Sequence, residues 1–184
     1  MTSRKRAQKH KYENRLWKGA YAWSSFQHVR NVCDYILSKP IQFEDAIYYP
    51  LVTAICVVYA RPFKTSKGIE SLTVQFVPKK FRYLHDQLIL LRDQTVAHVD
   101  ARSAPYKGLP ANNVRLIVNH GQVSLGVNEL RFTVATISEV RKLANALVER
   151  MHEYSNKLGR EYPHDVPDDG EYLIDLTTGT FRRL

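Results

Sequence analysis

The sequence predicts a mainly α-helical protein, an up-and-down bundle of four to five helices with an inserted β-hairpin and a small C-terminal hairpin. Apolar residues recur at steps of three and four over several long stretches, which is the spacing of one buried helix face. Between residues 114 and 127 the pattern changes to alternation, which is typical of paired strands. Hydrophobic residues make up 44% of the 184 residues, which is enough for the core of one domain.

The helical pattern covers four segments, which are residues 11–38, 43–60, 79–98 and 138–157. Pro40 ends the first helix, because a proline disfavours helical backbone at the residue before it. Pro50 falls inside the second segment and predicts a break or kink near Tyr49. Ser138 is expected to cap the fourth helix, and Gly159 stands just past its expected end.

The predicted hairpin is an insertion over about residues 112–133, and its turn is Asn119-His120-Gly121-Gln122. Residues 1–10 are expected to form a flexible basic arm, followed by a single helical domain over residues 11–158. Residues 159–184 form a C-terminal tail that contains the second, smaller hairpin.

The formal net charge is +9, from 27 Lys and Arg against 18 Asp and Glu. Residues 2–18 contain seven basic residues and only one acidic residue, so this stretch carries +6 of the total. Such an arm either attracts a polyanion such as RNA or is a solvated tail that favours solubility. The rest of the chain is close to balanced, so charge alone does not separate these two interpretations.

Cys33 and Cys56 lie in apolar helical patterns and have no CxxC spacing. We therefore expect buried, reduced thiols in a cytoplasmic protein. No window approaches the roughly 18 apolar residues of a membrane span, and the first residues lack the apolar core of a signal peptide. No phosphate-binding loop, GxSxG or HExxH motif is found, so no cofactor is predicted.

Arg92, Asp93 and His98 lie at the end of the third predicted helix, and these residue types suit RNA cleavage. A ribose 2′-hydroxyl can attack the adjacent phosphate if one group moves protons and another stabilises the phosphate charge. Histidine performs such proton transfers, and a guanidinium binds two phosphate oxygens. On a regular helix Arg92 and His98 would lie about 9 Å apart along the axis and roughly 120° apart around it. Either the helix bends, or a second copy of the chain completes the site.

Arg92-Asp93 followed by Ala97-His98 resembles the R-x(4–6)-H motif of HEPN domains. These are α-helical domains of ribonucleases in toxin–antitoxin, abortive-infection and other defence systems. Tyr83-Leu84-His85 and the stretch 59–63 also resemble bacterial proteins of this type. The hairpin and the C-terminal tail are not part of the basic HEPN bundle.

The resemblance implies metal-independent cleavage of RNA, with Arg92 and His98 catalytic and Asp93 supporting them. It also implies a homodimer whose two motifs line one cleft, and an antitoxin or regulatory protein as a further partner. The heptad-like seam on the third helix suits such a dimer. Many HEPN domains are instead non-catalytic modules that bind RNA, a nucleotide or a protein, and this is the alternative function.

Three basic residues, Arg61, Lys64 and Lys67, lie in one loop that could contact an RNA backbone, and His85 could line the same cleft. A solvated loop and a packed helix histidine are the structural alternatives. For Arg92 and His98, the corresponding alternatives are a surface ion pair and a helix-capping side chain.

Glu149 and His152 have the ExxH spacing of metal sites in helical bundles. Such sites need a second motif of this kind, and the sequence contains none. No metal site is therefore predicted.

Overall fold

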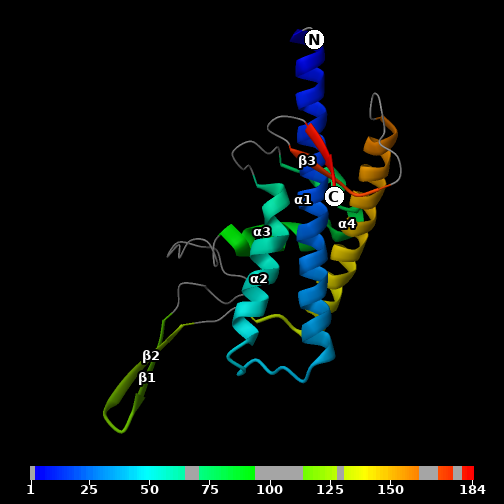
Figure 1. The fold of residues 1–184 in the computed structure, drawn as a ribbon. Coiled ribbons are helices and arrows are strands. Elements are labelled where there is room, and N and C mark those ends of the chain that lie inside the picture. The colour runs from blue at the N-terminus through cyan, green and yellow to red at the C-terminus, as the bar shows by residue number, and fades with distance from the viewer. Residues whose placement is uncertain (1–2, 65–70, 94–113, 128–130, 162–169, 176–179) are drawn as a thin grey trace.

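The computed structural model describes residues 3–64, 71–93, 114–127, 131–161, 170–175 and 180–184. Within these ranges the chain is mainly helical, as predicted, and Figure 1 shows the arrangement. The helices are α1 (Ser3–Ser38), α2 (Tyr48–Ala60), α3 (Arg82–Leu91) and α4 (Val134–Glu161). Three short 3-10 turns, η1 (Arg61–Phe63), η2 (Val74–Phe76) and η3 (Lys79–Phe81), lie between α2 and α3.

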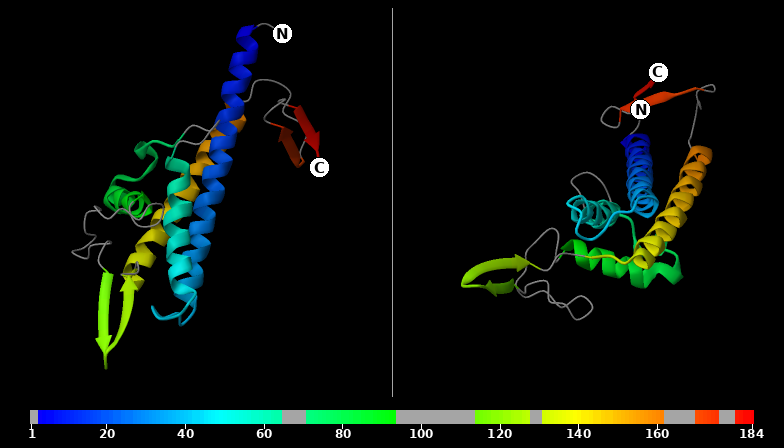
Figure 2. Two further views of the ribbon diagram at one scale, coloured as in Figure 1. Left: turned by 90° about the vertical axis from the view of Figure 1, so that its left-hand side faces the viewer. Right: turned by 90° about the horizontal axis from the view of Figure 1, so that it is seen from below.

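Helices α1, α2 and α4 lie side by side, and both α2 and α4 run antiparallel to α1 (Figures 1 and 2). Helix α3 instead runs across the other three helices (Figure 2), so the predicted up-and-down order does not extend to α3. The chain changes direction through η2, Pro78 and η3 before α3 begins. Proline fixes its own backbone and ends regular hydrogen bonding, which suits such a change of direction.

The hydrophobic core forms where the four helices meet, and every helix contributes to it. Its largest fully buried side chains include Phe26, Ile55, Tyr59, Leu88, Leu143, Leu147 and Met151. Cys33 and Cys56 belong to this core, and both are free thiols, as predicted. Burial raises the pKa of each thiol to about 12, so both stay protonated and unreactive near neutral pH.

The seam predicted on the third helix faces the core of its own chain. Phe81, Leu88 and Leu91 are buried among the other helices. Tyr83 lies on the outer face of α3, and 76% of it is exposed. A dimer through α3 would therefore use the face that carries Tyr83, and the described part of the seam would not take part.

The starts of α1 and α2 differ from the predicted ones by several residues. Helix α1 begins at Ser3 rather than Lys11, so residues 3–10, expected to be a flexible arm, continue the helix. Arg, Lys, Ala and Gln are strong helix formers, which explains this extension without an apolar face. Helix α2 begins at Tyr48 rather than Phe43. Pro50 thus lies in its first turn, where a missing N–H costs nothing. The predicted break near Tyr49 corresponds to the start of the helix at Tyr48, whereas the alternative of a kink inside the helix is wrong.

Helix α4 is longer at both ends than predicted. The Thr133 Oγ1 accepts a hydrogen bond of 3.1 Å from the backbone N–H of Thr136, which is the geometry of a helix N-cap. Thr133 therefore takes the capping role predicted for Ser138. Gly159, expected just past the end, lies inside the helix.

Both predicted hairpins are confirmed. Strands β1 (Val114–Asn119) and β2 (Gln122–Val127) pair antiparallel, and their turn places His120 at φ +47° and Gly121 at φ +76°. Two left-handed residues in succession are typical of the tight turn that suits a twisted hairpin. Strands β3 (Tyr172–Asp175) and β4 (Thr180–Arg183) form the second pair. The first hairpin projects away from the helices (Figures 1 and 2).

In the described part of the chain, no helix combines the length and the hydropathy that crossing a membrane would require.

Candidate functional site

Arg92 and Asp93 directly follow the last residue of α3. The backbone N–H of Arg92 still donates hydrogen bonds to the carbonyls of Leu88 and Ile89. The end of the helix therefore holds the backbone from which both side chains extend. The side chains of Arg92 and Asp93 remain 33% and 37% exposed. They can therefore be reached from solvent while their backbone is held by the core.

Asp93 is the centre of a three-residue ion cluster. Its Oδ1 accepts a hydrogen bond of 2.9 Å from Arg92 Nη1, and its Oδ2 lies 2.5 Å from Lys64 Nζ. Burial alone would raise the pKa of Asp93, but the hydrogen bonds and charges of Lys64 and Arg92 outweigh it and lower the pKa. The carboxylate is therefore ionised near neutral pH, and the cluster carries one net positive charge. Such a cluster can hold an anion at a fixed place beside α3.

His85 lies behind this cluster, packed in the core. Only 6% of it is exposed, so its ring offers almost no surface to an RNA strand, and the packed alternative describes it. Its Nδ1 lies 2.8 Å from the hydroxyl of Tyr59, and its ring meets the ring of Phe63 edge to face at 4.5 Å between centroids. Burial lowers the pKa of His85, Asp86 opposes this shift, and Lys64 adds to it. The ring is therefore neutral at pH 7.

The structure brings Lys64, which the sequence grouped with a basic loop, together with Arg92 and Asp93 of the predicted motif. Arg61 is exposed in η1, near Lys64 along the chain. Lys67 and His98 lie outside the described residues. The predicted proximity of Arg92 and His98 therefore stays a prediction.

Tyr59 and Phe63 support the site but were not assigned a role from the sequence. Tyr59 is fully buried, and its contact with His85 joins residues 26 positions apart. No local spacing predicts such a pair. The sequence singled out Tyr59 and Phe63 only as members of the stretch 59–63.

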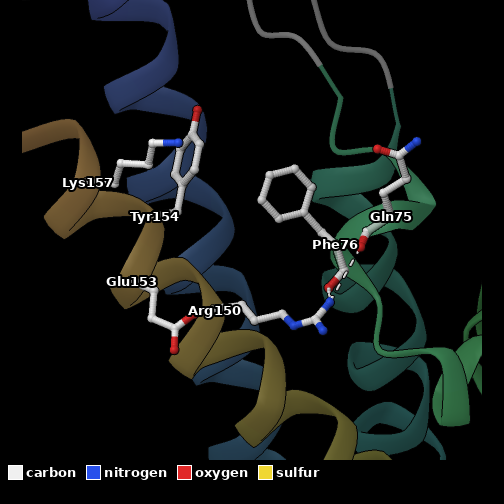
Figure 3. Close-up of a pocket in the computed structure, with 6 residues that line it drawn as sticks. All are labelled: Gln75, Phe76, Arg150, Glu153, Tyr154 and Lys157. Carbon is white, nitrogen blue, oxygen red and sulfur yellow. Dashed lines mark hydrogen bonds between the residues drawn. The ribbon is translucent and has the colours of Figure 1, made fainter. Parts of the chain in front are cut away.

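A hollow lies between η2 and α4 and has a volume of about 510 Å³. Figure 3 shows Arg150 reaching across it to the backbone of η2. Its Nη1 donates hydrogen bonds of 2.7 Å to the Phe76 carbonyl and 3.4 Å to the Gln75 carbonyl. Phe76 also packs edge to face on Tyr154, with centroids 5.7 Å apart. These contacts fasten η2 to α4, so Arg150 has a structural role.

Glu149 and His152 of α4 are both exposed. Among the residues with defined positions, no group of three or more His, Cys, Asp or Glu side chains is placed to hold a metal ion. The ExxH spacing therefore has no further ligands within that part of the chain.

Comparison of the chain with models of protein families, with curated proteins and with solved structures finds no match.

Proposed function

We propose that the protein is a metal-independent endoribonuclease of the HEPN type, acting in the cytoplasm as a toxin or phage-defence effector. The observation that carries the proposal is the meeting of Arg92, Asp93 and Lys64 at the end of α3. A guanidinium and an ammonium held by one carboxylate form a preorganised site for a phosphate. The resemblance of Arg92-Asp93 and Ala97-His98 to the HEPN motif supplies the reaction.

In the proposed reaction, a ribose 2′-oxygen attacks the neighbouring phosphorus and loses its proton, while the bond to the 5′-oxygen breaks. His98 moves these protons, as base for the 2′-hydroxyl or as acid for the 5′-oxygen. Arg92 neutralises charge on the phosphate oxygens, and Lys64 adds to the local positive charge. Asp93 orients Arg92. The products are a 2′,3′-cyclic phosphate and a free 5′-hydroxyl.

A second copy of the chain completes the site in this proposal, so that two motifs share one cleft. The outer face of α3 offers Tyr83 for this contact. In a toxin of this kind, an antitoxin or regulatory protein would control access to the cleft.

The test is cleavage of single-stranded RNA by the full chain in the presence of EDTA. We expect cleavage by the wild type, and a loss of about 100-fold or more in Arg92→Ala and His98→Ala, because each removes a group that acts in the transition state. Arg141→Ala and His152→Ala are matched controls, since both residues lie on α4 away from the ion cluster. Unchanged cleavage in both site variants would exclude the assignment.

The second candidate function is a non-catalytic module that binds RNA, a nucleotide or a protein. The observation that favours it is the pairing of both cations with Asp93, which lowers the charge available to a phosphate. Such a module would bind RNA in a salt-dependent way but release no cleaved product. Binding without any cyclic-phosphate ends would support this candidate over the enzyme.

A further inference from the structure

A continuous set of contacts links the buried ring of His85 to the ion cluster at Arg92. His85 packs against Phe63, the backbone continues from Phe63 to Lys64, and the Lys64 ammonium binds Asp93. Asp93 in turn binds Arg92. The link crosses from α3 to η1 and returns to the end of α3.

The first part of this link is held on several sides. The Tyr59 hydroxyl, 2.8 Å from His85 Nδ1, fixes the rotation of the imidazole. The Phe63 ring lies 4.5 Å from the His85 ring, 5.5 Å from Tyr59 and 5.8 Å from Phe26, measured between centroids. Close-packed aromatic rings leave little freedom to move separately. A change at His85 is therefore transmitted to Phe63.

The second part is the η1 turn, which closes just before Lys64. The Lys64 N–H donates to the Arg61 carbonyl at 3.3 Å, and the Leu72 N–H donates to the Pro62 carbonyl at 2.7 Å. These bonds fix the backbone from which the Lys64 side chain extends to Asp93. The position of Phe63 thus sets the point from which the Lys64 side chain begins, and Asp93 binds its far end.

Three groups with charge or titratable protons face His85: the Tyr59 hydroxyl from α2, Lys64 beyond η1, and Asp86 on α3 itself. Lys64 lowers the pKa of His85, which means that an imidazolium here would be repelled by the Lys64 ammonium. Protonation of His85 would therefore repel the Lys64 ammonium from its present position. The neutral ring is the form compatible with the Lys64–Asp93 pair.

We propose that His85 is a positioning residue, whose ring, fixed by Tyr59 and packed on Phe63, keeps Lys64 on Asp93 and so orients Arg92. The part that Arg92 takes in phosphate binding rests on the proposed function. The coupling between His85 and Asp93 does not rest on it and can be measured on the full chain alone.

The test is a pH titration by NMR, following the side-chain carboxyl carbon of Asp93 and the ring carbons of His85. In the wild type, the Asp93 signal should show a step at the midpoint at which His85 titrates. Tyr59→Phe keeps the aromatic packing and removes only the hydroxyl, and we expect both midpoints to move together. His85→Phe should abolish the step, whereas the matched control His152→Phe should leave it unchanged.

An Asp93 signal with no step in the wild type, or with the same step in His85→Phe, would overturn the proposal. If His85→Phe does not fold, Tyr59→Phe provides the test. The midpoints of the His85 signal and of the Asp93 step should then move together, and midpoints that move independently overturn the proposal. A merely structural role for His85 would change stability without this titration step. Failure of RNA cleavage with the step present would exclude the proposed function and leave the coupling standing.

Discussion

Asp93 accepts bonds from two cations that come from distant parts of the sequence. Lys64 follows η1, and Arg92 follows α3. The carboxylate therefore has two opposing effects: it orders both cations, and it cancels one of their two charges. In a phosphate site, the first effect serves catalysis and the second weakens binding. Substitution of Asp93 separates these two effects.

Asp93→Asn should slow RNA cleavage by about tenfold or more while tightening RNA binding. The slower reaction follows because Arg92 loses its orienting partner, and the tighter binding follows because one negative charge is removed. Rates under single-turnover conditions and dissociation constants at fixed salt measure the two effects. Asp86→Asn removes the same charge from an exposed position of α3 and should not slow cleavage. Weaker RNA binding by Asp93→Asn would contradict this account.

The burial of His85 predicts a pH dependence of stability. Because the folded pKa of His85 is lowered, the unfolded chain binds a proton more readily than the folded one. The free energy of unfolding should therefore fall as the pH drops below about 6.5, the ordinary histidine pKa, and continue to fall until the lower folded pKa is passed. Denaturant titrations at several pH values should show this decline in the wild type and a smaller decline in His85→Phe. A wild-type stability that increases over this acidic range would contradict the assignment.

The sequence pointed to Arg92 and Asp93 because a motif of adjacent residues contains both. It grouped Lys64 only with other basic residues of its loop, since a contact across 29 positions leaves no periodic signal. Tyr59 was placed in a buried helix, but nothing in the pattern paired it with His85. Local motifs therefore predict which residues carry chemistry, whereas tertiary packing decides which of them meet.

At the scale of single elements, the interiors of the helices were predicted well and their ends were not. The apolar stripe that identifies a helix is absent from residues 3–10, although their composition favours a helix. Pro50 was interpreted as a kink because the start of α2 had been placed five residues too early. Both hairpins were predicted correctly. For the first, alternation and a turn containing Gly121 are local signals.

The start of α4 offers a direct test of a helix cap. Thr133→Ala removes the Oγ1 that accepts the N–H of Thr136, and it should lower the free energy of unfolding by about 0.5–2 kcal/mol. Ser138→Ala, at the position where the sequence predicted the cap, should lower the free energy of unfolding much less. Thermal or denaturant unfolding of the two variants measures both losses of stability. Equal losses would mean that the Thr133 bond does not cap the helix.

At the scale of the molecule, one buried contact ties the start of α4 to α2. The Tyr48 hydroxyl donates to the Phe132 carbonyl at 2.5 Å and accepts from the Phe132 N–H at 3.0 Å. This contact spans 84 positions, and so it could not be predicted from sequence periodicity. The crossing of α3 was missed for a similar reason, because the direction taken after Pro78 depends on packing against the other helices.

The burial of the α3 seam bears on assembly. Because Phe81, Leu88 and Leu91 serve the core, the proposed homodimer would use the outer face of α3. Light scattering should then give twice the mass of one chain for the wild type. Tyr83→Glu should shift this equilibrium toward the monomer, because it places a charge in the interface. Tyr35→Glu, at an exposed position of α1, is the control. A wild type that is monomeric at working concentrations would exclude a site shared by two chains.

In the proposed reaction, the chain cleaves RNA through the ribose 2′-hydroxyl without a metal. The most direct measurement is the chemical identity of the product ends formed by the full chain in EDTA. We expect 2′,3′-cyclic phosphates and 5′-hydroxyls, and we expect a substrate with 2′-deoxyribose at the cleaved position to stay intact. Cleavage of that deoxy-substituted substrate at the same position, or products that carry 5′-phosphates, would contradict the proposed reaction.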